Sequence, residues 1–367
     1  MPNSSLRVVI TGATGNIGSR LVPALAEDPA VDSVLGLARR RPDPSLWSSG
    51  NVEFATFDLA GDEQARLNDL LDGADVVVHL AWRLQPTHDP VLTWETNVTG
   101  TRRLLEAMAS ARVPALIHSS SVGAYSPGSK DATGVSEDWP TNGWPTAAYT
   151  REKAYLERVL DGFERADPAR RVVRLRPGFA LSRESASEQH RLFAGSLIPG
   201  GLARPSLIPI VPDLPGMRVQ VVHSLDLAEA FRLATVGSAR GAFNVAADPV
   251  LDAYALAELL QARTVRTPAR VVRAALSAGW RLHAVPSTPE LFDALLRLPI
   301  MDTGRVRREL DWSPEHNSMQ TMAEFLQGVR EHADSPTPPL RAPARLRDRW
   351  RSSRFRPTPQ PGGYAGW

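Results

Sequence analysis

Short apolar runs alternate with helical patterns through the first half of the chain. The runs around Val76-Val77-Val78 and Val172-Val173 are continuous, which is typical of strands buried on both faces. The pattern predicts strands at 6–11, 33–38, 52–57, 75–80, 114–119 and 171–176, and helices near 16–27, 63–72, 91–112 and 146–166. Because strand and helix alternate, we expect an α/β fold, with a doubly wound parallel sheet and helices on both faces. Such a sheet binds ligands at the carboxyl ends of its strands.

The second half of the chain is less regular and richer in proline. We expect loops and short elements over the ligand site at 178–220, then a strand at 219–223, a helix at 225–236, a strand at 241–246, and helices near 253–262 and 317–332. The chain then divides into a first domain at 1–177, a smaller C-terminal lobe at 178–334 interleaved with late sheet elements, and a Pro/Arg-rich tail at 335–367. We expect the tail to be disordered, with a short docking helix at 346–350 as the alternative.

Charge is spread unevenly along the chain. The 367 residues carry a net +2, and the tail at 335–367 has seven arginines and one aspartate, a balance of +6, which leaves −4 for the rest. The body therefore gives no electrostatic reason to expect nucleic acid as a partner. The chain has no cysteine, and no group of His, Asp and Glu has metal-ligand spacing, so we predict neither disulfides nor a metal. Without a signal-peptide pattern or a membrane-spanning run, we expect a cytoplasmic protein with no membrane partner.

Residues 11–18 read Thr-Gly-Ala-Thr-Gly-Asn-Ile-Gly, between a predicted strand and a predicted helix. This context is the one that a dinucleotide site requires. Gly12 lets the chain turn off the strand, Gly15 lets the backbone approach a pyrophosphate, and Gly18 lets helix and strand pack closely. The start of the helix then offers unpaired N–H groups and a positive dipole end to the phosphates. The stretch therefore predicts a dinucleotide as cofactor.

A second signal lies on the predicted helix at 146–166, where Tyr149 and Lys153 are four residues apart and share one face. A nearby ammonium stabilises a phenolate, so we expect the pKa of Tyr149 to lie below its usual value of about 10. Such a tyrosine serves as an acid/base near neutral pH. Ser119, Ser120 and Ser121 end the strand before this helix, and a hydroxyl there is suited to hold a substrate oxygen beside the tyrosine.

Further motifs follow in a consistent order. They are Asp58-Leu59, His79-Leu80-Ala81, Asn97 to Thr101, Tyr125, Arg176-Pro177-Gly178, His223 with Asp226-Leu227-Ala228, and Glu309 to Pro314. With the glycine turn, the serines and the Tyr–Lys pair, the chain resembles the extended short-chain dehydrogenase/reductase superfamily, and within it the NAD-dependent epimerase/dehydratase group. The resemblance covers about residues 6 to 330. It implies a Rossmann-like sheet with a substrate-binding C-terminal lobe, but it says little about the substrate.

The resemblance also implies roles for matching positions. The catalytic residues would be Ser121, Tyr149 and Lys153, with Ser120 as the near alternative to Ser121. The cofactor-binding residues would be Gly12, Thr14, Gly15, Asn16, Ile17, Gly18, Asp58, Leu59, Leu80, Ala81, Asn97, Tyr149, Lys153 and Pro177. Plainer interpretations stay open: Asp58 and Asn97 are also suited to cap helices, and His223 and Asp226 to begin one, with Ser224 or Asp226 as its cap.

The second strand points to the form of the cofactor. An NAD enzyme usually ends this strand with an acidic residue that bonds the ribose 2′-hydroxyl. Here Ala38 stands near that place, and Arg39 and Arg40 follow. Since a guanidinium pairs with a 2′-phosphate, we expect Arg39 and Arg40 to bind the cofactor and NADP to be preferred over NAD. The alternative is a solvated basic turn.

The shared chemistry of the family is hydride transfer coupled to proton transfer, and two outcomes follow from it. A dehydrogenase or reductase changes the redox state of a small-molecule substrate, whereas a nucleotide-sugar epimerase or dehydratase returns the hydride. The apolar segments near 197–199 and 207–211 favour net oxidoreduction. Nucleotide-sugar relatives carry an arginine for the diphosphate, and Arg218 lies about one residue from its expected place. A non-catalytic NADP-binding regulator is a further alternative. The resemblance implies a homodimer formed by the helices near 91–112 and 146–166.

Overall fold

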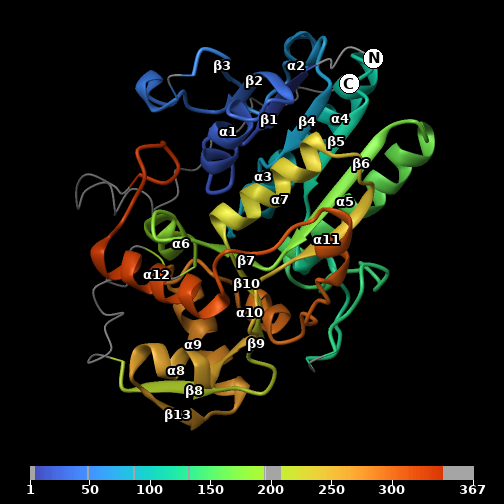
Figure 1. Ribbon diagram of the computed structural model, residues 1–367. Coiled ribbons are helices and arrows are strands. Elements are labelled where there is room, and N and C mark those ends of the chain that lie inside the picture. Colours follow the sequence, from blue (N-terminus) through green and yellow to red (C-terminus); the bar gives the residue numbers. More distant parts are fainter. Residues whose placement is uncertain are drawn as a thin grey trace, which may run out of the picture.

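Seven parallel strands form the central sheet, in the order β11-β6-β5-β4-β1-β2-β3 (Figure 1). The computed structural model describes residues 5–47, 49–85, 87–130, 133–193, 195 and 208–341. The strands are β1 (Leu6–Thr11), β2 (Val31–Ala38), β3 (Val52–Thr56), β4 (Val76–His79), β5 (Ala115–Ser119), β6 (Arg171–Pro177) and β11 (Gly241–Val245). The predicted doubly wound parallel sheet is confirmed, and each strand lies within two residues of its predicted range.

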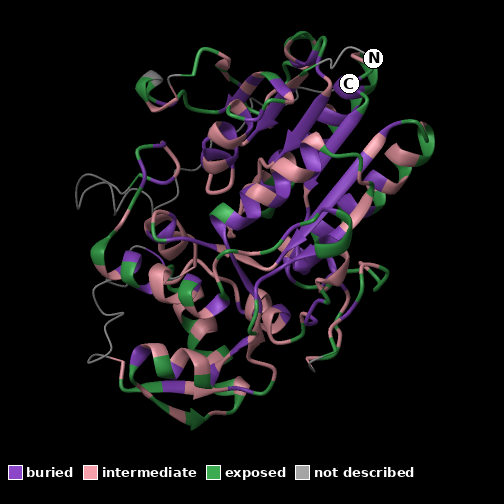
Figure 2. Ribbon diagram, in the orientation of Figure 1, coloured by how far each residue is buried: buried purple, intermediate pink, exposed green. Residues whose placement is uncertain are grey.

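Helices cover both faces of the sheet. Helices α1 (Gly18–Ala26) and α7 (Ser224–Val236) pack on one face, and α2 (Gln64–Leu71), α4 (Gly100–Ser110) and α5 (Ala148–Ala166) on the other. Because side chains alternate along a strand, Val8 and Ile10 join the first core while Val9 joins the second. Both cores exclude solvent, so the inner strands such as β4 and β5 are largely buried, whereas the edge strand β3 is partly exposed (Figure 2).

The helix predicted near 91–112 consists of three consecutive parts. Helix α3 (Pro90–Trp94) continues into a π-helical turn, η2 (Glu95–Thr99), and then into α4. The Asp89 side chain caps α3 by accepting from the backbone N–H of Leu92 at 3.1 Å. The π turn holds Asn97, whose buried amide bonds to groups on two other segments, as described below. Single π turns of this kind are frequent where a helix adapts to a functional site.

The second half of the chain forms a lobe beyond the carboxyl ends of the strands (Figure 1). Its short strands pair as β7 (Phe179–Leu181) with β10 (Val221–His223), β9 (Arg218–Val219) with β12 (Leu251–Asp252), and β8 (Ile210–Asp213) with β13 (Arg263–Arg266). Its helices are α6 (Ala186–Phe193), α8 (Ala253–Leu260), α9 (Ala269–Arg281), α10 (Pro289–Leu295), α11 (Gly304–Glu309) and α12 (Ser318–Glu331). The turns η1 (Pro44–Leu46) and η3 (Val122–Ala124) complete the described elements.

The strand predicted at 219–223 is wrong in one respect, because it is broken at Gln220. The side chain of Gln220 donates to the carbonyl of Met301 at 3.0 Å and accepts from its backbone N–H at 2.7 Å. These contacts turn the residue out of a continuous ladder, so β9 and β10 belong to different small sheets. Helices α6, α9, α10 and α11 were not predicted.

The last described residues return to the first half of the chain. Leu340 is fully buried, and Nη2 of Arg191 on α6 donates to the carbonyl of Pro339 at 3.0 Å. Residues 335–341, the start of the predicted tail, therefore pack on the body. The rest of that tail, with the alternative helix at 346–350, lies outside the described residues, as do residues 194 and 196–207 of the segment predicted to form loops over the ligand site. No helix in the described part of the chain is long and apolar enough to cross a bilayer.

His79 ties three elements together at the end of β4. Its Nδ1 forms a hydrogen bond of 2.6 Å with the hydroxyl of Thr11 on β1, and its Nε2 one of 2.8 Å with the hydroxyl of Thr101 on α4. Burial, with a smaller contribution from the charge of Lys153, lowers the pKa of His79 to about 3. The imidazole is therefore neutral in the folded protein at any pH near neutrality.

This burial makes folding depend on pH. The unfolded imidazole takes up a proton below its usual pKa of about 6.5, whereas the folded one does not until about pH 3, so stability falls as the pH drops through this window. Through His79 alone, lowering the pH from about 7 to about 5 should reduce the free energy of unfolding by about 2 kcal/mol, as measured by urea denaturation. The variant His79→Gln, whose amide is suited to bond both hydroxyls, should lose this share of the pH dependence. An unchanged pH dependence would contradict the expectation.

A buried ion cluster fastens β6 to α5 behind the strand ends. Glu157 accepts from Arg176 Nε and Nη2, each at 2.9 Å, from Arg174 Nη1 at 3.2 Å, and from the hydroxyl of Ser120 at 2.5 Å. Burial by itself would raise the pKa of Glu157, but the hydrogen bonds and charge of Arg176, with Ser120 and Arg174, hold that pKa below its usual value. Because Ser120 directly follows β5, the cluster also holds the end of this strand against α5.

Removing the charge at the centre of this cluster should be costly. Glu157→Gln leaves two buried guanidinium groups short of their carboxylate, so the free energy of unfolding should fall by about 3 kcal/mol or more. The matched control is Glu164→Gln, which also removes a carboxylate partner of Arg174 but at a side chain that is 34% exposed. Its cost should stay below about 1 kcal/mol. Chemical denaturation of both variants checks the difference, and similar costs would argue against it.

Candidate active site

The glycine turn lies against the end of β4. Gly12 has a φ of +73°, and a Cβ there would lie 2.7 Å from the backbone nitrogen of Ala81. A Cβ at Gly18 would lie 2.4 Å from the carbonyl oxygen of Gly12, so α1 can start this close to β1 only with glycine. Gly15 meets no atom of another segment. The local geometry therefore matches the three distinct roles expected for these glycines.

Two adjoining cavities open over this turn. The larger, about 910 Å³, runs from the turn past the ends of β5 and β6 into the C-terminal lobe, and the smaller, about 150 Å³, lies over the end of β2. The larger is lined by eleven of the predicted site residues: Gly12, Gly15, Asn16, Ile17, Gly18, Arg39, Leu80, Ser121, Tyr149, Lys153 and Pro177. The smaller adds Thr14, Arg40, Asp58, Leu59 and Ala81. The fold thus brings nearly the whole predicted set to one continuous space.

Asn97 is the predicted site residue that lines neither cavity. Its Oδ1 accepts from the backbone N–H of Arg83 at 2.7 Å, and its Nδ2 donates to the Arg83 carbonyl at 2.8 Å and to Glu152 Oε2 at 2.7 Å. The amide therefore holds the segment after β4 in place from behind. Its predicted contact with the cofactor stays a prediction.

Ser121, Tyr149 and Lys153 meet where β5 ends and α5 begins. The hydroxyl of Tyr149 donates to Ser121 Oγ at 2.9 Å, and the same oxygen accepts from the backbone N–H of Gly123 at 2.9 Å. Lys153 Nζ donates to the carbonyl of Ser119 at 2.7 Å. Ser120 points the other way, to Glu157. Of the two serines considered, Ser121 is therefore the one that the structure brings to the tyrosine.

The pKa of Tyr149 shifts opposite to the prediction. Burial raises it, and the charge of Glu152 adds to the effect, while the hydrogen bond to Ser121 opposes it. The ammonium of Lys153 does not reverse the shift, because burial lowers the pKa of Lys153 itself to about 7. Tyr149 is thus a neutral phenol in this arrangement. A neutral phenol is a proton donor.

Trp82 and Glu152 were not among the predicted site residues, yet both adjoin the pair formed by Tyr149 and Lys153. Lys153 Nζ lies 3.5 Å from the centroid of the Trp82 ring, and the ring edge meets Tyr149 at a centroid distance of 5.7 Å. Trp82 directly follows Leu80 and Ala81, so its place after the strand end was the available signal. Glu152 is buried between the pair and Asn97, and it also accepts from Thr93 at 2.8 Å. No local pattern marks it.

Three arginines surround the smaller cavity. Arg39 and Arg83 border both cavities, and Arg40 borders the smaller one with Asp58. Burial, and then the charge of Arg39, lowers the pKa of both Arg40 and Arg83. Asp58 itself accepts from the backbone N–H of Ala60 at 3.1 Å. Three guanidinium groups therefore gather at the end of β2, beside the carboxyl groups of Asp58 and Glu188, and an anionic ligand group would be attracted to the guanidinium groups.

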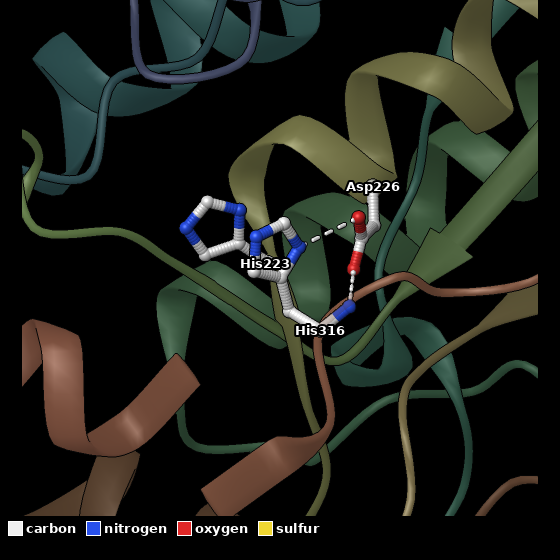
Figure 3. A group of neighbouring side chains, drawn as sticks. All are labelled: His223, Asp226 and His316. Carbon is white, nitrogen blue, oxygen red and sulfur yellow. Dashed lines mark hydrogen bonds and ion pairs between the residues drawn. The ribbon is translucent and has the colours of Figure 1, made fainter. Parts of the chain in front are cut away.

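In the described part of the chain, one group of histidine and carboxylate side chains is compact enough to suggest a metal site (Figure 3). His223, Asp226 and His316 offer atoms within 4.8 Å of one another, outside the lining of both cavities. However, the two rings stack at 4.0 Å and 24°, so their nitrogen lone pairs lie in two nearly parallel planes, an arrangement that does not suit tetrahedral coordination of one ion. Both oxygens of Asp226 also accept from His316, through its backbone N–H and its Nδ1, each at 3.0 Å.

These contacts serve to join α7 to the segment before α12. His223 Nδ1 accepts from the backbone N–H of Leu225 at 3.3 Å, so His223 is the cap of α7 in place of the predicted Ser224 or Asp226. Its Nε2 faces Glu324 on α12 at 3.4 Å. The group therefore links the sheet to the C-terminal lobe.

Comparison with known proteins agrees with this geometry. An uncharacterised protein of Mycobacterium tuberculosis is 24% identical over 326 residues, which cover 88% of this chain and 83% of that protein. A UDP-glucose 4-epimerase of Neisseria meningitidis is 28% identical over 269 residues, with 67% of this chain and 76% of the enzyme covered. A UDP-glucose 4-epimerase of Corynebacterium glutamicum is 25% identical over 339 residues, with 87% and 94% covered.

Solved structures share the fold. The UDP-glucose 4-epimerase of Thermus thermophilus in complex with NAD aligns with a TM-score of 0.65 and 21% identity, over 89% of this chain and 99% of that one. The dTDP-glucose 4,6-dehydratase of Streptomyces venezuelae, also with NAD, gives a TM-score of 0.64 and 21% identity over 89% and 97%. The model of the NAD dependent epimerase/dehydratase family matches residues 8–246. The chain therefore belongs to the NAD dependent epimerase/dehydratase family.

Proposed function

We propose that this protein transfers hydride between a nicotinamide cofactor and a carbonyl or alcohol substrate in a net redox reaction, with Tyr149 moving the proton. The observation that carries the proposal is the hydrogen bond of 2.9 Å from Tyr149 to Ser121, on the wall of a cavity that begins at the glycine turn. The residues present fit a dinucleotide: Gly12 and Gly18 let the turn pack closely on its neighbours, Gly15 meets no atom of another segment, and the cavity extends from this bare backbone to Tyr149.

When bound, the cofactor supplies or accepts the hydride. In the reductive direction, Tyr149 gives its proton to the substrate oxygen as the carbon of the carbonyl gains the hydride. Ser121 holds the same oxygen by its hydroxyl. The raised pKa of Tyr149 suits this direction, because the phenol is fully protonated near neutral pH. Lys153, one helical turn along α5, is placed to stabilise the phenolate that remains.

Removing the hydroxyl of Tyr149 should abolish most turnover. Tyr149→Phe should lower kcat by a factor of about 10² to 10⁴, the usual contribution of a positioned acid/base, while cofactor binding persists. The matched control is Tyr155→Phe on the same helix. The ring of Tyr155 is exposed and packs on Trp94, so this variant should leave kcat unchanged. Steady-state kinetics with cofactor titration measure both. Full activity of Tyr149→Phe would rule out the role.

We further propose that NADP is preferred over NAD. The support is the group of like charges formed by Arg39, Arg40 and Arg83 at the end of β2, where Ala38 takes the place of an acidic residue. The relatives of known structure named above hold NAD, so NAD is the alternative.

The arginines offer a direct test of this preference. Arg39→Ala should weaken NADP binding by about tenfold to a hundredfold, because a charged hydrogen bond is lost, and should leave NAD binding nearly unchanged. Arg41→Ala, at an exposed position outside both linings, is the control. Isothermal titration with both dinucleotides measures the change. Equal losses for NADP and NAD would contradict the proposal.

A redox-neutral epimerase or dehydratase is the second candidate, favoured by the relatives themselves. It would retain its cofactor through dialysis and consume none during turnover, whereas the net reaction consumes one dinucleotide per product. A non-catalytic regulator is the third, and it is disfavoured because Tyr149, Lys153 and Ser121 are all in place.

We also propose a homodimer. Helix α3 and the facing part of α5 expose Val91, Trp94 and Tyr155, which form an apolar patch on the outer side of the sheet. Sedimentation velocity should show a dimer. A monomer at all protein concentrations would contradict the proposal. The cytoplasmic location stays a prediction.

A further inference from the structure

Beyond Tyr149, the larger cavity enters the C-terminal lobe and its wall becomes apolar. Six different elements contribute half-buried apolar side chains there: Phe193 of α6, Val219 of β9, Leu256 of α8, Leu276 of α9, Leu295 of α10 and Phe325 of α12. Each side chain is covered by its neighbours on one side and faces the cavity on the other. A molecule that fills this space would therefore remove apolar surface from water on every side.

The cations of the described wall lie at the other end. They are Arg39 and Arg83, which also border the smaller cavity, and Lys153, which is held by Ser119 and Trp82. In the lobe, the described wall contains no lysine or arginine, and it includes the carboxylate of Asp252. A diphosphate group needs charged donors in place, and its burial without them is costly.

Arg218 is the residue that the sequence offered for a diphosphate, and its strand turns it away. Met217 and Val219, its two neighbours, line the cavity, whereas Arg218 does not. Since successive side chains of a strand point to opposite sides, Arg218 on β9 points away from the cavity that its strand neighbour Val219 lines. There the guanidinium of Arg218 donates to the carbonyl of Lys130, whose own Nζ donates to the carbonyl of Arg218 at 2.7 Å. Each cation is thus engaged with the backbone of the other.

We propose that the substrate of this site is a large apolar molecule with one secondary alcohol or ketone, and not a nucleotide diphosphate sugar. The inference rests on the proposed function for the reacting group, since Tyr149 and Ser121 mark where a hydroxyl or carbonyl oxygen lies. The rest of the molecule occupies the apolar end of the cavity within the lobe. Its affinity comes from burial of hydrocarbon, and a negative charge at that end would meet Asp252.

A homologous series of ketones tests the proposal. From 2-hexanone to 2-dodecanone, kcat/KM with the preferred reduced dinucleotide should rise by about threefold for each added methylene, as expected for hydrocarbon that leaves water. The matching 2-alkanols, titrated calorimetrically into the protein saturated with oxidised dinucleotide, should show the same dependence of affinity on length. UDP-glucose should give neither turnover nor heat of binding.

A pair of variants on α9 locates the binding. Leu276→Lys places an ammonium in the apolar end and should lower the affinity for 2-dodecanol by at least about tenfold, with dinucleotide affinity unchanged. Leu282→Lys, at the end of the same helix and 79% exposed, is the control and should have no effect. Because Leu276 is only half-buried, the variant should fold, and its melting temperature checks this.

The outcomes separate the two proposals. If the alkanols bind in a way that depends on length and on Leu276 but no hydride is transferred, the substrate class holds and the proposed reaction fails. If UDP-glucose binds or reacts and depends on Tyr149, the apolar substrate is overturned while the acid/base role stands. Failure of every ketone and alkanol to bind also overturns the substrate class.

Discussion

The close approach of the first glycine turn to the end of β4 is the constraint on which the rest of this site depends. Gly12 contacts the backbone at Ala81, and Gly18 contacts Gly12, so three chain segments meet with no side chain between them. This contact sets where α1 begins and where the segment after β4 leaves the sheet. Trp82 and Arg83 come directly after Ala81, so the contact also sets where these two side chains lie. Trp82 packs against Lys153, and Arg83 lies near Arg39 in the arginine group.

Behind this contact, buried polar groups hold the strand ends in register. His79 joins β1, β4 and α4, Asn97 holds the segment after β4, and Glu157 fastens β5 and β6 to α5. Each is satisfied by several partners, which is the condition for a buried polar group to be tolerated. These buried contacts therefore hold the proposed catalytic groups in place, while the lobe would contact the substrate. This division of labour lets one sheet serve different substrates by changes in the lobe alone.

The sequence allowed the sheet to be predicted because its strands are short, mostly apolar runs that alternate with helical patterns through the first half of the chain. The site was predictable to the extent that its residues are local: Gly12 to Gly18 share one turn, and Tyr149 and Lys153 share one helix face. The break at Gln220 was not predictable, because it depends on contacts with Met301, which is 81 residues away. The pKa of Tyr149 was predicted in the wrong direction for a similar reason: the sequence shows the lysine nearby but not the depth of burial. Helix α9 was missed as well; none of its residues is fully buried, and its Leu276 faces the cavity.

The return of the last described residues to the first half of the chain bears on how the protein is made. Pro339 borders the smaller cavity together with Thr11, Gly12, Thr14 and Gly15, so its rim joins the first strand to a segment more than 300 residues later. A nascent chain on the ribosome can form the sheet long before that segment emerges from the exit tunnel. The rim of this cavity, however, closes only once Pro339 has emerged, so a chain that stops before this residue would have the sheet and the Tyr–Lys pair with an open edge where the arginines gather.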